Sequence, residues 1–174
     1  MYSLVYTSKI VGVTGVGILT TFGFCISAMI IPGVFATDLP ASKLLQIWDE
    51  THRRGFTFAG ASLVTSASAF LFAAYLQRDH PSLPLTVLGI TEATHLALAG
   101  ATVLGGAVFT LIALIPGIKS LEARHAAVEK AKAKGLEPEI DRKGVMSEMK
   151  TLSMGNSVRT GIFAISFLLG VSAL

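Results

Sequence analysis

Four stretches of about 20 mostly apolar residues constrain this chain more than any other feature of its sequence. They run roughly over residues 10–31, 55–76, 90–115 and 155–174, the third lying within a longer apolar region from Leu85 to Ile115. An α-helix rises 1.5 Å per residue, so about 20 apolar residues cross the hydrocarbon core of a bilayer. The sequence therefore predicts an all-α, integral membrane four-helix bundle.

The composition agrees with a membrane protein. Hydrophobic residues make up 52% of the chain and charged residues only 14%, whereas soluble domains have nearly a quarter charged residues. On a water-soluble globule this apolar surplus would leave large exposed patches, so it needs lipid to face. With 174 residues the chain has the length of one domain, and we expect residues 1–174 to form a single four-span unit.

Small residues within the spans predict close packing between helices, because they let backbones approach each other in lipid. The first span has glycines at positions 12, 15, 17 and 23, and the third has them at 100, 105 and 106. The second span has Ala, Ser and Thr instead. The first span is longer than the apolar core of a signal peptide, so we expect it to be retained.

The distribution of basic residues predicts the orientation. Four spans place the segments 32–54 and 117–154 on one side, and these carry nearly all the Lys and Arg residues. The positive-inside rule then puts both long loops in the cytosol and both termini on the opposite side. This bias explains the bases better than nucleic-acid binding. The membrane would be the endoplasmic reticulum in a eukaryote and the plasma membrane in a bacterium.

The long loop between the third and fourth spans includes a stretch from Ser120 to Lys134 that is rich in Ala, Glu and Lys. It predicts a helical extension that runs out of the third span and stops at Gly135 and Pro138. Its charges indicate a solvated face, with contact to anionic lipid as the alternative.

Trp48 and His52 are four residues apart, so they share one helical face where the second span begins. A histidine near its unperturbed pKa accepts a proton at neutral pH, which suits a general base at the mouth of a pocket. The alternative is an interfacial anchor: Trp at the head-groups, Arg53 and Arg54 snorkelling, and His52 incidental.

Asn156 and Arg159 begin the fourth span three residues apart, on the same predicted side as Trp48 and His52. Arg159 is a candidate to stabilise an oxyanion and Asn156 to orient a carbonyl. Taken alone, an arginine at the end of a span is usually just an anchor.

Glu92 and His95 are secondary candidates because they lie within the third apolar segment, where ionisable groups are costly and face a bundle interior. Their i, i+3 spacing predicts either that one satisfies the other or that they form a site. His80, beside Pro81 in the short outer turn, is expected to be a surface residue.

A metal site is a weaker hypothesis. A carboxylate precedes a histidine by three residues at Asp49/His52, Glu92/His95 and Glu122/His125. Two such motifs build a di-iron centre only with a Glu from each remaining helix, and the first and fourth spans contain no carboxylate. The first two pairs lie toward opposite membrane faces, about 30 Å apart at 1.5 Å per residue. Asp49/His52 and Glu122/His125 lie on the same predicted side, so a mononuclear cytosolic site formed by them remains as an alternative. The single cysteine, Cys25, excludes an internal disulfide.

These motifs resemble the anthrone oxygenase-like membrane family, small four-span proteins found beside polyketide pathways. The first span ends in Gly23-Phe-Cys-Ile-Ser-Ala-Met-Ile-Ile-Pro32, and the second is preceded by Trp48-x-x-x-His52-x-x-Gly55. The third ends at Pro116, and the fourth is similar to the family's W-x-x-x-N-x-x-R pattern around Asn156 and Arg159. The resemblance covers nearly the whole chain.

The chain also departs from the family. The family often has Trp where this chain has Leu152 or Ser153, and Asn where it has Ile118. The Ile118 difference removes a polar group and leaves the substrate open.

The resemblance implies oxidation of an anthrone to an anthraquinone with molecular oxygen and without a cofactor. It implies His52 as the base, Arg159 with Asn156 on the oxyanion, and Trp48 stacked on the flat substrate. It leaves homo-oligomerisation open.

Two other classes of function remain open from the sequence: a non-catalytic membrane scaffold, and a metal- or haem-dependent oxidoreductase. A scaffold would splay Trp48, His52, Asn156 and Arg159 toward lipid, whereas an enzyme would bring them to one pocket. A transporter is disfavoured because no span looks broken and no internal repeat is visible.

Overall fold

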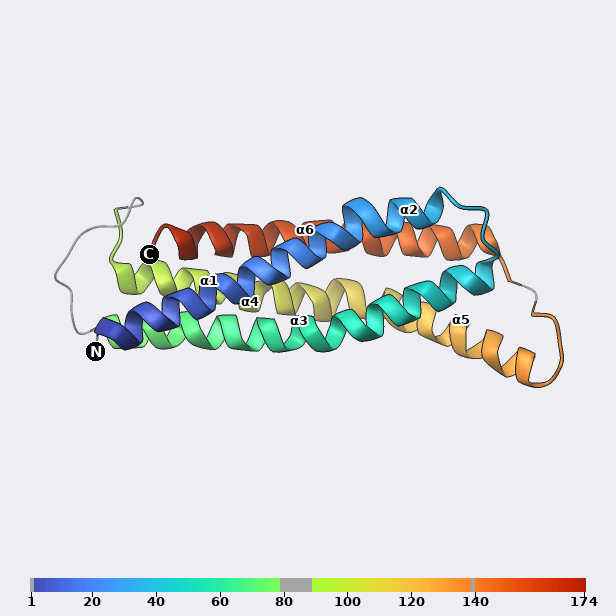
Figure 1. The fold of residues 1–174 in the computed structure, drawn as a ribbon, viewed down its shortest axis with the longest axis horizontal. Helices are drawn as coiled ribbons and strands as arrows, with labels where there is room; N and C mark the ends of the chain where they lie inside the picture. Colours follow the sequence, from blue (N-terminus) through green and yellow to red (C-terminus); the bar gives the residue numbers. More distant parts are fainter. Residues whose placement is uncertain (1, 79–88, 139) are drawn as a thin grey trace.

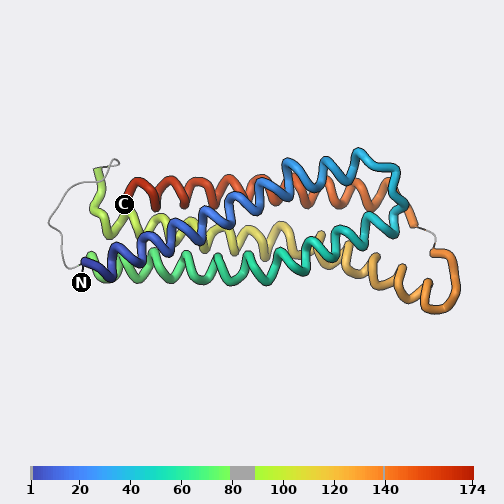
Figure 2. Tube along the Cα trace, viewed as in Figure 1, coloured from blue at the N-terminus to red at the C-terminus, as the bar shows by residue number. Residues whose placement is uncertain are grey.

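The apolar stretches form helices in the computed structural model, which describes residues 2–78, 89–138 and 140–174. Within these residues, four helical segments are long and apolar enough to cross a membrane: Tyr2–Phe35, Ala41–Gln77, Glu92–Ala133 and Arg142–Val171. They lie lengthwise in one elongated bundle with both termini at the same end (Figures 1 and 2). The prediction of an all-α bundle of four membrane-crossing helices is confirmed.

Each of these four helical segments forms one column of the bundle. Two of the columns are single helices, α3 (Ala41–Gln77) and α6 (Arg142–Val171). Each of the other two contains one π-helical turn. The first column consists of α1 (Tyr2–Cys25), the turn η1 (Ile26–Ile30) and α2 (Ile31–Phe35). The third consists of α4 (Glu92–Phe109), the turn η2 (Thr110–Leu114) and α5 (Ile115–Ala133).

The prolines do not end these columns, which corrects the predicted stops near Pro32 and at Pro116. Each proline lies at the start of an α-helix, two residues beyond the end of a π turn. Proline lacks an N–H group, and in an α-helix its ring crowds the carbonyl four residues earlier. A widened turn just before the proline relieves that conflict while the chain stays helical.

The loops predicted at 32–54 and 117–154 are largely helical. On the side opposite the termini, the described residues outside the helices are 36–40, 134–138 and 140–141. The predicted extension of the third span is confirmed: α5 runs to Ala133, and Gly135 follows with a positive φ of 70°, a conformation that favours glycine after a helix end. The long loop is therefore a short link between helical extensions.

The third span begins within two residues of its predicted start at residue 90. Helix α4 starts at Glu92, where Thr91 caps it by accepting a hydrogen bond from the backbone N–H of Thr94 at 3.3 Å. The start of that region at Leu85 and the predicted surface residue His80 lie outside the described residues.

Two apolar clusters hold the bundle together, one toward the termini and one around the helical extensions. Phe70 of α3 is fully buried within the first cluster. A Cβ atom added to Gly12 of α1 would lie 2.8 Å from the Phe70 ring, and one added to Gly170 of α6 would lie 2.6 Å from it. The glycines therefore let α1 and α6 close around one aromatic ring, as the small-residue pattern predicted.

We expect Gly12→Ala to lower stability by about 1–3 kcal/mol, because the new methyl group overpacks a ring that has no free space to move into. Gly60→Ala is the matched control, since a Cβ at Gly60 meets nothing within 4 Å. It should leave stability unchanged or raise it by up to about 1 kcal/mol. Thermal unfolding in detergent, followed by circular dichroism, compares the two; equal melting temperatures would contradict this account of the Phe70 contact.

Candidate functional site

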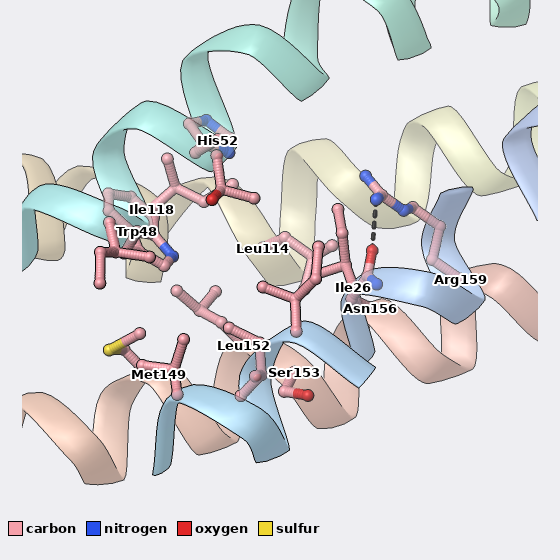
Figure 3. A pocket seen from close by; sticks show the side chains of 15 residues that line it. Ile26, Trp48, His52, Leu114, Ile118, Met149, Leu152, Ser153, Asn156 and Arg159 are labelled. Atoms are coloured by element: carbon pink, nitrogen blue, oxygen red, sulfur yellow. Dashed lines mark hydrogen bonds between the residues drawn. The ribbon is translucent and has the colours of Figure 1, made fainter. Parts of the chain in front are cut away.

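An apolar pocket lies where the two π turns face α3 and α6 (Figure 3). All four columns contribute to its wall. Most of the wall is aliphatic, and among the side chains that form it are Ile26, Ile31, Leu114, Ile118, Met149 and Leu152. The space that these side chains leave free is about 90 Å³.

All four residues predicted for the main site line this pocket. Trp48 and His52 reach it from α3, and Asn156 and Arg159 reach it from α6. They come from distant parts of the sequence and converge on one space, which is what a binding site requires. Interfacial anchors would instead point toward lipid and head-groups.

The Trp48 and His52 rings are stacked, with their centroids 5.2 Å apart and their planes within 3° of parallel. One turn further along α3, Phe56 lies 5.8 Å from the His52 ring. The two residues share a helical face, as their spacing predicts. Because His52 covers one face of the indole, only the other face is left for the predicted stacking of a flat ligand. The indole nitrogen is turned toward the pocket in Figure 3.

Asn156 is fully engaged within the protein. Its Nδ2 donates to the backbone carbonyl of Gly23 at 2.9 Å and to Ser27 Oγ at 2.7 Å, and its Oδ1 accepts from Arg159. Both hydrogens of the amide are thus already donated, so they are not available for the predicted task of orienting a substrate carbonyl. In the structure Asn156 instead joins α6 to the first column and holds Arg159 in place.

Arg159 is a cation without a counter-charge in the described structure. Its Nε is buried and has no hydrogen-bond partner, and no carboxylate within the described residues forms an ion pair with it. Its Cζ lies 6.0 Å from the centroid of the Phe163 ring. A guanidinium group at the edge of a largely apolar pocket can stabilise negative charge that develops on a ligand.

Glu92 and His95 lie at the other end of the bundle, and the prediction that they satisfy each other is wrong. Glu92 forms an ion pair with Lys9 of α1, which is itself only 8% exposed and donates to the carbonyl of Ala173 at 2.7 Å. The fully buried His95 places Nε2 2.9 Å from Ser172 Oγ. The partners come from other helices, so the two residues tie α1, α4 and α6 together near the termini.

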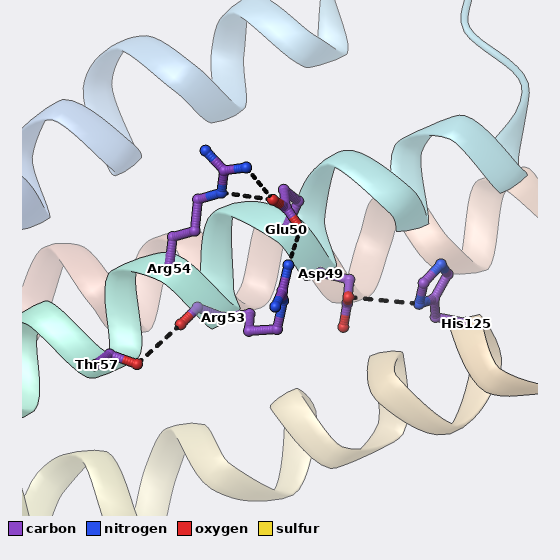
Figure 4. Close-up of polar contacts among 6 residues, drawn as sticks. All are labelled: Asp49, Glu50, Arg53, Arg54, Thr57 and His125. Carbon is purple, nitrogen blue, oxygen red and sulfur yellow. Dashed lines mark hydrogen bonds and ion pairs between the residues drawn. The ribbon is translucent and has the colours of Figure 1, made fainter.

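Two residues of the alternative metal hypothesis, Asp49 of α3 and His125 of α5, face each other away from His52, which lines the pocket (Figure 4). Asp49 Oδ2 and His125 Nδ1 are 3.8 Å apart. Glu50 accepts from both Arg53 and Arg54, at 2.7 and 2.5 Å. Within the described residues, no group of three or more His, Cys, Asp or Glu side chains has an arrangement that could hold a metal ion.

A short repeat that was not predicted forms part of the pocket. The segments Ile31-Pro-Gly-Val34 and Ile115-Pro-Gly-Ile118 each follow a π turn, and Val34 and Ile118 both line the pocket. The shared Ile-Pro-Gly run was the available signal. Ser27 was also missed: its hydroxyl accepts from Asn156 and donates to the carbonyl of Ser153 at 3.3 Å.

No protein-family model, curated protein or solved structure matches this chain.

Lys9→Ala should lower stability by about 1–3 kcal/mol, because it leaves the Glu92 carboxylate without its counter-charge. Glu92 is partly exposed, so the expected loss is smaller than the roughly 3–5 kcal/mol of a fully buried pair. Lys43→Ala is the control, since Lys43 is exposed and its ammonium group donates a hydrogen bond to the exposed Gln46. The double variant Lys9→Met/Glu92→Gln should recover most of the loss in a thermal melt. A Lys9→Ala melt identical to that of Lys43→Ala would show that the ion pair contributes nothing.

Proposed function

We propose that this protein is a membrane-bound oxygenase that converts an anthrone-type aromatic polyketide to an anthraquinone with molecular oxygen. The observation that carries the proposal is the convergence of Trp48, His52, Asn156 and Arg159 on one apolar pocket inside a membrane-spanning bundle. The pocket combines a group that can accept a proton, a cation that can stabilise an oxyanion, and walls that suit an apolar substrate.

The first step is removal of a benzylic proton. The C–H bond of an anthrone is acidic because its anion is a delocalised, phenolate-like aromatic. His52 accepts the proton, and Arg159, held by Asn156, stabilises the negative charge on the substrate oxygen. Histidine suits this step because its unperturbed pKa leaves it largely neutral at pH 7.

Oxygen then reacts with the carbanion. One electron passes from the carbanion to O₂, the two radicals combine to form a C–O bond, and protonation gives a hydroperoxide. Loss of the second benzylic proton forms the new C=O bond as the O–O bond breaks and hydroxide leaves. One oxygen atom ends in the quinone and the other in water. The balance requires no cofactor as electron donor.

Substrate binding requires side chains to move. The free space of about 90 Å³ is well below the roughly 300–1,000 Å³ of typical ligand pockets. Met149 is unbranched and flexible, which suits it to giving way. Ile118, Leu152 and Ser153, where the chain departs from the family it resembles, all line the pocket. These positions therefore bear directly on which polyketide is accepted.

We further propose that the pocket lies in the cytosolic half of the bundle. The residues that line the pocket come from the part of each column that leads into the helical extensions, away from the termini, and those extensions carry most of the basic residues. The positive-inside rule then puts both termini on the side of the membrane opposite the cytosol. The membrane is that of the endoplasmic reticulum if the source is eukaryotic. A substrate made by a cytosolic synthase would reach the pocket from that side. The proposal holds for a monomer or a homo-oligomer.

Oxygen consumption by detergent-purified protein with emodin anthrone tests the proposal. Wild type should exceed the spontaneous rate, and His52→Ala should lower the enzymatic rate by about 10²–10⁴-fold, the usual contribution of a general base. His125→Ala is the matched control. His125 lies beside the same part of α3 and pairs with Asp49, but it does not line the pocket. It should stay within about twofold of wild type.

A chelator separates the cofactor-free mechanism from a metal-dependent one. Wild-type activity should be unaffected by it. Activity lost on chelation and also lost in His125→Ala would instead indicate a metal-dependent oxidoreductase. No oxidation of emodin anthrone or related polyketides above background by folded protein would contradict the proposed function and leave the scaffold interpretation.

A further inference from the structure

The charges on the side chains that line the pocket are unbalanced. Arg159 contributes a guanidinium group, whereas none of the described residues that line the pocket is an aspartate or a glutamate. The one carbonyl oxygen known to contact Arg159 is Oδ1 of Asn156, which carries no net charge. Trp48 adds an N–H group that makes no hydrogen bond to another described residue, and Figure 3 shows its nitrogen turned toward the pocket. The wall therefore offers one positive charge and an additional donor.

Lys9, the buried cation at the other end of the bundle, differs from Arg159 because its charge is paired. It has its own carboxylate, Glu92, and also donates to a backbone carbonyl. On the extensions, Arg124 pairs with Glu148 at 2.6 Å, and Arg53 and Arg54 share Glu50. An unpaired charge removed from water is destabilising. The missing counter-charge of Arg159 is best supplied by what the pocket binds.

We propose that the pocket takes amphiphilic acids dissolved in the bilayer, ligands with an apolar body and one ionised oxygen group that binds Arg159. The apolar body would lie against Ile26, Leu114 and Leu152. A phenolate on a fused-ring aromatic and the carboxylate of a free fatty acid share this chemistry. The inference rests on the proposed function for the location of the site, and it adds that the ligand is selected as an anion before any reaction occurs.

Trp48 provides the measurement, because it is the single tryptophan of the chain and it lines the pocket. The probe for the fatty-acid arm is 9,10-dibromostearate, whose bromines quench indole fluorescence on contact, compared with its methyl ester. The probe for the phenolate arm is 2-hydroxyanthraquinone, at a pH above the pKa of its hydroxyl group, compared with 2-methoxyanthraquinone. Each pair differs mainly in the ionised oxygen.

In wild type we expect the anion of at least one pair to bind tenfold or more tightly than its neutral partner. The acid and the neutral probe partition differently into micelles. The decisive comparison is therefore between wild type and Arg159→Gln, and the quantity compared is the affinity for the anion divided by the affinity for its neutral partner. The variant should lose the preference, with binding of the neutral probe unchanged. Arg159→Lys should retain part of it. Arg124→Gln, which removes a charge outside the pocket, should retain all of it.

Preference in only one arm identifies the source of the ligand, either membrane carboxylate or aromatic phenolate. Equal binding of acid and neutral probe in both arms, or a preference that persists in a folded Arg159→Gln variant, would overturn the inference. The binding assay needs no turnover. An anion preference without oxygen consumption would therefore remove the proposed function alone, and oxygen consumption without the preference would remove this inference alone.

Discussion

A polar group inside a bilayer must find its partner within the protein, since lipid tails offer none, and this requirement organises the bundle. Glu92, Lys9 and the carbonyl of Ala173 form one linked set near the termini. Ser166 reaches from α6 to the carbonyl of Ala99 on α4 at 2.8 Å. Asn156 joins α6 to Gly23 and Ser27. Each of these contacts joins one helix to another, so the hydrogen bonds and ion pairs that satisfy polar groups also hold the helices together. Within the described residues, Nδ1 of His95 and Nε of Arg159 are buried nitrogens without a hydrogen-bond partner, and the second of them lies at the pocket.

The pocket follows from how two columns accommodate a proline. Pro32 and Pro116 come just after η1 and η2, so the first and third columns widen before they continue as α2 and α5. A π turn places its side chains on a different face from the one that an unbroken α-helix would present, and such turns often occur at functional sites. Here they contribute Ile26 and Leu114 to the wall.

Interactions within one helix could be predicted from the sequence, and interactions between helices mostly could not. Spacing alone placed Trp48 with His52 and Asn156 with Arg159, and both pairs are in contact. The same reasoning failed for Glu92 and His95, because their partners Lys9 and Ser172 lie on other helices and outcompete an i, i+3 contact. The meeting of α3 with α6 around one pocket also depends on helix rotation, which periodicity does not determine. The predicted helix ends at Pro32 and Pro116 were wrong, because a π turn before each proline lets the chain remain helical.

The arrangement of the pocket suits a reaction that separates charge. His52 belongs to the part of α3 that leaves the apolar stretch, beside the exposed Glu50, Arg53 and Arg54. A proton taken up there can be exchanged with water. Arg159 begins the apolar span of α6, with its Nε buried and Phe163 nearby. Electrostatic attraction to an oxyanion is stronger there, because the local dielectric is lower. In the proposed reaction, the proton therefore moves toward water while the electron-rich oxygen stays beside a fixed cation. Exchanging the two positions would leave the oxyanion screened by water and the base with no route to return its proton.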